Sequence, residues 1–247
     1  AEDGDLPGDL RARETPRPGD LGQAQQNVGQ LTGRVRIKTE KPLPDLENVK
    51  LPPGKILDES LVFSKEGGLA NVFLYLWKPA FTFKEPAATA PPKPFVLIAE
   101  DGRFWPHAAL VRFGRSVILE NRNLEIVNFR VQANRNNSHN VAVQRGGRFA
   151  IQPFELRENT PVLVTSDLQP WVKAYVFPIE HPFAAITDED GRFAINGLPP
   201  GEHDFRVWHE RVGWLEKSPV ITIKPGEDTR SELEYAPDRL KLTEAEV

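Results

Sequence analysis

The stretch "VLVTSDLQPWVKAY", residues 162–175, shows the pattern that dominates the chain. It begins as an apolar strand, passes through a polar turn that contains Pro170 and Trp171, and continues as a second strand. Further strand-length runs follow from residue 30 onward, rich in β-branched or aromatic residues and bounded by Gly, Pro, Asn or Asp, among them "FVLIAE", "SVILEN" and "NFRVQA". No long amphipathic helix pattern interrupts them. The sequence therefore predicts an all-β protein.

The composition narrows the possible chemistry. The 247 residues are enough for one large β domain or two smaller ones. The chain has no Cys and no Met, which excludes disulfides, thiolate metal sites and cysteine nucleophiles. The net charge of −4 and the lack of a basic block argue against a nucleic-acid partner. The longest apolar runs, such as "VFLYLW", are too short for a membrane-spanning helix, so we expect no transmembrane segment.

The chain divides by composition into four parts. Residues 1–27 carry few large apolar side chains and are predicted to form a flexible N-terminal arm. We expect the first β-sandwich at residues 28–178, the second at 179–236, and a C-terminal tail at 237–247. The Pro-rich pieces 41–55 and 84–94 are predicted loops. The acidic start "AEDGDLPGD", without an initiator Met, predicts a mature chain after signal-peptide removal, secreted or periplasmic.

Two long segments resemble known families. "DESLVFSKEGGLANVFLYL" (58–76) and "GRFWPHAALVRFGRSVILENRN" (102–123) resemble a cupredoxin-like domain of secreted bacterial proteins, particularly of planctomycetes. "EHPFAAITDEDGRFAINGLPPGEHDFRVWHE" (180–210) resembles a carboxypeptidase regulatory-like domain, which is a transthyretin-like sandwich. The resemblance implies two packed β-sandwiches, the first a cupredoxin-like Greek key. The short linker between them should leave little slack, so that they pack as one body.

The cupredoxin resemblance also implies where copper ligands would stand. The family's His, Cys, His and Met ligands fall at Val127, Ser166, Gln169 and Val172, and all four are changed. A blue-copper centre depends on a thiolate, two imidazoles and a weak axial thioether. These four side chains do not supply that set. We therefore expect degenerate copper-ligand positions, no metal and no cofactor.

The five histidines show no metal-ligand spacing. His107 is expected to have a hydrogen-bonded structural role, and His139 to lie in a solvated loop. His209 and Glu210 are expected at a strand end, since the second His of a zinc-protease motif is missing. His181 and His203 carry no motif.

Two other motifs are weak. Asp188, Asp190 and Gly191 could begin a calcium loop, but the later ligands are missing, which favours a hairpin turn. No serine stands in a nucleophile motif, and no acid and base pair is spaced for catalysis. We expect no enzyme activity.

Tryptophan residues are the remaining candidates for recognition. Trp105, Trp171 and Trp214 are weak candidates for binding a sugar or a protein. Trp171 and Trp208 also fit packing in the core or between the sandwiches, which we favour, although the sequence leaves both alternatives open.

The sequence as a whole predicts a non-catalytic structural or adaptor protein of the cell envelope or an extracellular assembly. It would bind protein partners through the N-terminal arm and the Pro-rich loops, in a homo- or hetero-assembly. The alternatives are copper-binding electron transfer at a rebuilt site and a carbohydrate-binding module.

Overall fold

The computed structural model describes residues 28–38, 59–83 and 92–242. The predicted N-terminal arm, the Pro-rich piece at 41–55, most of that at 84–94 and the end of the tail lie outside the described residues. The described residues form strands and one 3₁₀ turn, η2 (Pro237–Leu240), with no α-helix among them. The all-β prediction is confirmed. No helix in the described part is long and apolar enough to cross a membrane.

The first sandwich is built from two sheets of the middle of the chain. One sheet has the order β5-β11-β10-β7-β8 and the other β4-β3-β6-β9. Most neighbours are antiparallel, but β5 pairs with β11, and β3 with β6, in parallel. The strands are β3 (Phe95–Glu100), β4 (Arg103–Trp105), β5 (Ala108–Arg112), β6 (Val117–Asn121), β7 (Val127–Gln132), β8 (His139–Val143), β9 (Arg148–Ile151), β10 (Val162–Thr165) and β11 (Lys173–Ile179).

Alternation along these strands builds the first core. In β7 the residues Val127, Phe129 and Val131 are buried while their neighbours point outward. Phe129 stacks on Phe104 of the facing sheet, with ring centroids 4.8 Å apart. The core therefore lies between the two sheets, as the period-2 pattern predicts.

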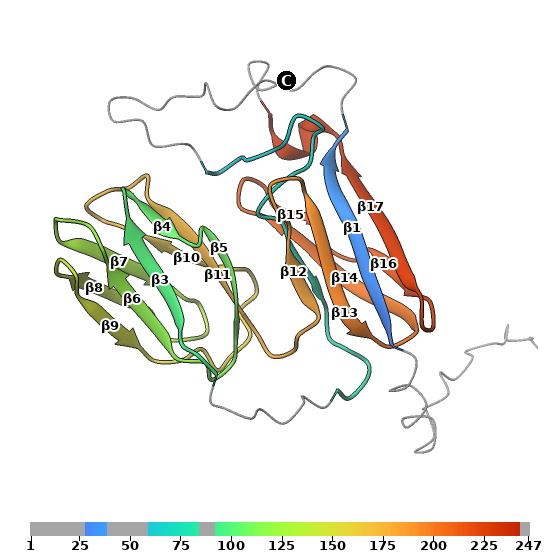
Figure 1. Cartoon of the computed structure of the whole chain (residues 1–247), viewed down its shortest axis with the longest axis horizontal. Coiled ribbons are helices and arrows are strands. Elements are labelled where there is room, and N and C mark those ends of the chain that lie inside the picture. Colours follow the sequence, from blue (N-terminus) through green and yellow to red (C-terminus); the bar gives the residue numbers. More distant parts are fainter. Residues whose placement is uncertain (1–27, 39–58, 84–91, 243–247) are drawn as a thin grey trace, which may run out of the picture.

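The second sandwich combines both ends of the described chain. One sheet has the order β13-β1-β17 and the other β12-β2-β14-β15, with β16 paired to β14. Figure 1 shows this sandwich beside the first one. The strands are β1 (Gly29–Ile37), β2 (Phe73–Leu76), β12 (Ala184–Ile186), β13 (Arg192–Leu198), β14 (Gly201–His209), β15 (Gly213–Glu216), β16 (Val220–Ile223) and β17 (Asp228–Tyr235).

The expected boundary between the sandwiches is wrong for the N-terminal strands. The pattern of the sequence predicts residues 28–178 in the first sandwich, but β1 pairs with β13 and β17, and β2 pairs with β12 and β14. Gly68, which lies between β1 and β2 in the sequence, also packs closely against the second sandwich: a Cβ added to it would lie 1.9 Å from the carbonyl oxygen of Asp190. Partner strands more than 100 residues away leave no trace in the local pattern, which explains the error.

A third apolar cluster joins the two sandwiches, and we call it the seam. Its fully buried members are Phe73, Tyr75 and Trp208 of the second sandwich and Phe177 and Ile179 of the first. Figure 1 shows β5 and β11 facing β12 and its neighbours across this junction. The two sandwiches are therefore packed against each other through aromatic side chains.

Candidate functional site

The turn at residues 166–172 is held by hydrogen bonds at one end of the first sandwich. The backbone N–H of Asp167 donates to Oδ1 of Asn128, at 2.8 Å. The Asp167 carboxylate accepts from Asn140 Nδ2 at 3.0 Å and from Arg130 at 3.2 Å. These hydrogen bonds hold the pKa of Asp167 below its ordinary value. One carboxylate therefore ties the turn to both β7 and β8.

The four predicted copper-ligand positions lie around this turn. Val127 and Val172 are buried and belong to the same core cluster. Ser166 is buried, and its Oγ accepts from the backbone N–H of Gln169 at 3.3 Å. The Gln169 carbonyl accepts from the Val172 N–H at 2.9 Å. In this structure, two of the positions fill the core and two form hydrogen bonds that close the turn.

Exposed apolar side chains surround the same end of the sandwich. Leu168 and Trp171 project from the turn with 59% and 54% of their surface exposed. Leu124 and Ile126, in the loop between β6 and β7, are 70% and 41% exposed. Because β10 runs antiparallel to β7 and the Asp167 N–H donates to Asn128, the turn after β10 and the loop before β7 lie at the same end of this sheet. We call these four residues the apolar loop end.

Most of this surface is not predicted from the sequence. Trp171 is a candidate from the sequence, where packing in the core or between the sandwiches is favoured for it. That prediction is wrong, because the side chain is 54% exposed. Leu124, Ile126 and Leu168 were not recognised. The available signal was the presence of large apolar residues within the otherwise polar segments "NRNLEI" and "TSDLQPW".

The other tryptophans are placed differently. Trp105 is 42% exposed, and the guanidinium of Arg103 lies 5.0 Å from its ring centroid. Trp214 is half-buried and packs against the seam. Trp208 is buried in the seam, as the packing alternative predicts. Of the three candidate binding residues, Trp171 is the most exposed, while Trp105 is partly exposed and lies against Arg103.

A buried ion cluster lies beside the seam. His107 of the first sandwich forms an ion pair through Nε2 with Glu210 of the second, and its Nδ1 lies 3.6 Å from Oε2 of Glu59. Burial by itself lowers the pKa of His107, but the hydrogen bonds and charges of Glu210 and Glu59 outweigh it and raise this pKa to about 9. The predicted hydrogen-bonded role of His107 is confirmed.

The remaining histidines are held by local hydrogen bonds. His209 is fully buried at the end of β14, where its Nδ1 accepts from the Arg211 N–H at 3.4 Å. Burial, and then the charges of His107 and Arg211, lower the pKa of His209 to about 4. His203 Nε2 donates to the Pro199 carbonyl at 2.7 Å.

Two local predictions have different outcomes. His139 was expected in a loop, but it is the first residue of β8 and is half-buried, because β8 pairs with β7 from this residue on. The hairpin turn at Asp188 is confirmed: Oδ1 of Asp188 accepts from the N–H groups of Asp190 and Arg192, at 2.9 and 2.8 Å. Among the residues described, no group of three or more His, Asp or Glu side chains is placed to hold a metal ion.

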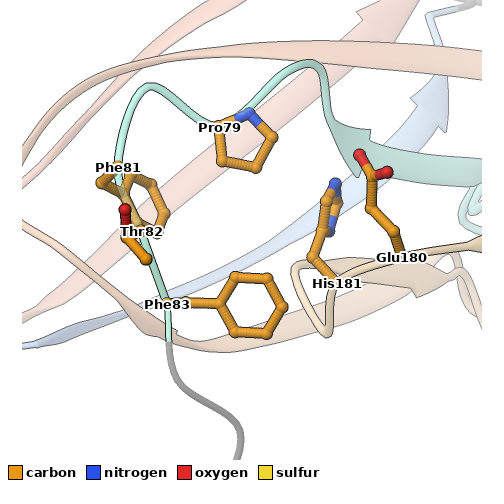
Figure 2. Close-up of a pocket in the computed structure, with 6 residues that line it drawn as sticks. All are labelled: Pro79, Phe81, Thr82, Phe83, Glu180 and His181. Atoms are coloured by element: carbon orange, nitrogen blue, oxygen red, sulfur yellow. The ribbon is translucent and has the colours of Figure 1, made fainter.

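An aromatic pocket of about 250 Å³ opens where the linker meets the second sandwich. Figure 2 shows Pro79, Phe81 and Phe83 on one side of it, with Glu180 and His181 opposite. His181 Nε2 donates to the Leu76 carbonyl at 3.0 Å and its Nδ1 accepts from the Phe183 N–H at 3.3 Å.

The two ionisable groups of this pocket, His181 and Glu180, are already engaged. Burial, and then the charge of Arg157, lower the pKa of His181 to about 4. Glu180 forms an ion pair with the same Arg157. A neutral imidazole with both nitrogens occupied and a paired carboxylate leave the pocket largely apolar in character.

Comparisons with known proteins give only distant similarities. No family model matches the chain, and no curated protein matches it. A copper-containing nitrite reductase from Thermus scotoductus SA-01 is 15% identical with a TM-score of 0.34, covering 41% of this chain and 26% of that one. A reduced amicyanin variant is 12% identical with a TM-score of 0.31, covering 38% of this chain and 95% of that one.

A second amicyanin variant, in a reduced Cu(I) form, is also 12% identical, with a TM-score of 0.32, and covers 37% of this chain and 87% of that one. The present chain spans about a quarter of the nitrite reductase. Copper is a feature of the nitrite reductase and the second amicyanin variant, and it is not carried over to the present chain.

Proposed function

We propose that this protein is a non-catalytic adaptor of the cell envelope or extracellular space. In this proposal its first sandwich is a copper-free cupredoxin-like scaffold, and its second is a carboxypeptidase regulatory-like sandwich. The apolar loop end binds a protein partner. The secreted or periplasmic location rests on the sequence resemblance.

The apolar loop end carries this proposal. Single exposed apolar side chains are common on protein surfaces, but four of them in two loops at one end of the sandwich favour binding to another protein. The Asp167 hydrogen bonds fix the turn before any partner arrives. A preorganised surface loses less conformational entropy on binding, which favours affinity.

The side chains around the turn at residues 166–172 support the proposal that the first sandwich binds no copper. Val127 and Val172 offer only apolar side chains, and the Ser166 hydroxyl already accepts a hydrogen bond. The chain holds no Cys to supply a thiolate. Metal analysis of the purified protein, with and without added Cu(II), tests this part. Tight stoichiometric copper would contradict it and favour electron transfer at a rebuilt site.

Partner binding is tested with variants of the exposed residues. The native protein is purified from its source with bound partners, and the affinity of the purified partner is then measured. Leu168→Asp and Trp171→Ala should each weaken binding about tenfold or more, because central apolar residues dominate interface energies. Phe149→Ala on β9 is the matched control, since Phe149 is 43% exposed and lies outside the loop end. Unchanged affinity in both loop-end variants would overturn the proposal.

Self-association through the same patch is a special case of protein binding. Sedimentation of the purified chain distinguishes it, because Leu168→Asp would then shift an oligomer towards the monomer.

Carbohydrate binding through tryptophan is the second candidate, favoured by the exposed rings of Trp105 and Trp171. A glycan array with the Trp171→Ala variant tests it. Trp214, which packs against the seam, is a poorer choice for this test.

A further inference from the structure

A polar cavity lies at the other end of the first sandwich from the apolar loop end. It has a volume of about 320 Å³ and is lined by Arg135, Asn136 and Asn137 of the β7–β8 loop and by the segment that follows β9. Strand β7 connects the two regions: Val127 begins it beside the apolar loop end, and Gln132 ends it just before the cavity. The cavity is therefore separate from the proposed protein-binding surface.

The walls of the cavity are fixed by a buried carboxylate. Glu158 is fully buried, and it accepts from the backbone N–H groups of Asn134, Arg135 and Asn136, at 3.2, 2.9 and 2.9 Å. Burial raises the pKa of Glu158, but these donors and the Asn136 amide outweigh it and lower this pKa below its ordinary value. The loop is thus held in one conformation by a charged acceptor.

A second set of hydrogen bonds joins the loop to the opposite wall. The Asn136 side chain donates to the Leu156 carbonyl at 2.7 Å and accepts from the N–H groups of Glu155 and Leu156, both at 2.9 Å. Arg135 donates to the carbonyl of Arg157 at 3.2 Å. The cavity is therefore preformed, as small-molecule sites usually are.

The side chains that line the cavity include both hydrogen-bond donors and hydrogen-bond acceptors. The amides of Asn137 and Gln152 hydrogen-bond to each other, and each amide can both donate and accept. Arg135 supplies N–H donors and Glu155 supplies carboxylate oxygens, so one positive and one negative charge offset each other. This lining favours a neutral ligand with many hydroxyl groups over a strongly charged one.

The rest of the cavity lining is apolar, and the cavity is small. Pro153 and Leu156 add hydrocarbon surface, and Leu156 is 47% exposed. Ligand pockets commonly span about 300–1,000 Å³, so this cavity is at the small end of that range. A sugar ring has hydroxyl groups at its rim, carbon-bound hydrogens on its faces, and a size that suits such a cavity.

We propose that this polar cavity binds one neutral sugar residue of a glycan. Gln152, Asn137, Arg135 and Glu155 exchange hydrogen bonds with its hydroxyl groups, while Pro153 and Leu156 contact its apolar face. The proposal does not depend on the adaptor function, because the two surfaces lie at different ends of the sandwich.

The test screens the full chain against an array of neutral and acidic glycans and measures the affinity of each neutral hit by calorimetry. Gln152→Ala and Glu155→Ala should each weaken binding about tenfold, since each removes hydrogen bonds to the sugar. Gln144→Ala is the matched control for the lost amide, because Gln144 is exposed in the β8–β9 turn at the other end of the sandwich. It should change affinity less than about twofold.

Three results would overturn the proposal. The first is no binding of any neutral glycan up to about 10 mM of sugar, well above the range of weak lectin-type sites. The second is binding of acidic glycans alone. The third is binding that Trp171→Ala abolishes and Gln152→Ala leaves unchanged, which assigns the sugar to the exposed tryptophan. Loss of partner binding in the Leu168→Asp variant, by contrast, bears only on the adaptor function.

Discussion

His107 and Glu210 form an ion pair that connects the two sandwiches at the edge of the seam. His107 follows β4 in the first sandwich, and Glu210 follows β14 in the second. Their side chains are only 7% and 5% exposed. A buried pair of opposite charges holds its partners in one geometry, because losing either one leaves the other charge unpaired in a poorly solvated place.

The alkaline pH dependence of stability should come from His107. Its pKa is about 9 in the folded protein and near 6.5 when unfolded, so the folded state binds the proton more tightly. The resulting stabilisation, about 3 kcal/mol, is fully present below pH 6.5 and is lost as the pH rises through about 9. Urea titrations across this range should show the loss, and His107→Gln should remove it. An unchanged alkaline slope in that variant would contradict the assignment.

The acid dependence should come from His209. Its pKa is about 4 when folded, because burial and the nearby His107 charge disfavour protonation, and near 6.5 when unfolded. The unfolded state then binds the extra proton, so stability is highest above pH 6.5 and falls as the pH drops towards 4. His209→Gln, which cannot protonate, should flatten this slope in unfolding measurements from pH 6.5 to 4.5. His181 contributes to the same range, so a residual slope is expected.

Local patterns predict the strands well and their partners poorly. The buried alternation of Leu31, Val35 and Ile37 marks residues 29–37 as a strand, but the same pattern fits either sandwich. Its pairing with β17, nearly 200 residues later, depends on the assembled sheet. The turn at 166–172 was predictable from Pro170 and the flanking strands. The polar cavity was not, because its two walls are far apart in the sequence and are joined by hydrogen bonds of residues such as Glu158 and Asn136, which form only in the tertiary fold.

The seam should determine whether the sandwiches unfold together. Trp208 packs on Phe73 with ring centroids 5.5 Å apart and on Tyr175 of the first sandwich at 5.2 Å. Trp208→Ala should lower the free energy of unfolding by about 3–5 kcal/mol and separate the melting of the two sandwiches. Trp171→Ala removes the same side chain from an exposed site and should cost less than about 1 kcal/mol. A single calorimetric transition in both variants, with equal Tm, would contradict this role of the seam.

The turn at residues 166–172 offers the strongest test of the cupredoxin-like assignment. Val127→His, Ser166→Cys, Gln169→His and Val172→Met together place two imidazoles, a thiolate and a thioether around a turn that Asp167 already holds in place. The quadruple variant should bind Cu(II) and absorb visible light through the copper–thiolate bond, although His and Met in place of two buried valines should lower its stability.

Optical titration with Cu(II) provides the measurement, and circular dichroism shows whether the variant folds. The triple variant that keeps Ser166 is the matched control, because it has both imidazoles and the thioether but no thiolate, and it should stay colourless. A quadruple variant that folds and remains colourless would show that these four side chains do not converge as the resemblance implies. Colour that depends on Ser166→Cys would instead show that they do.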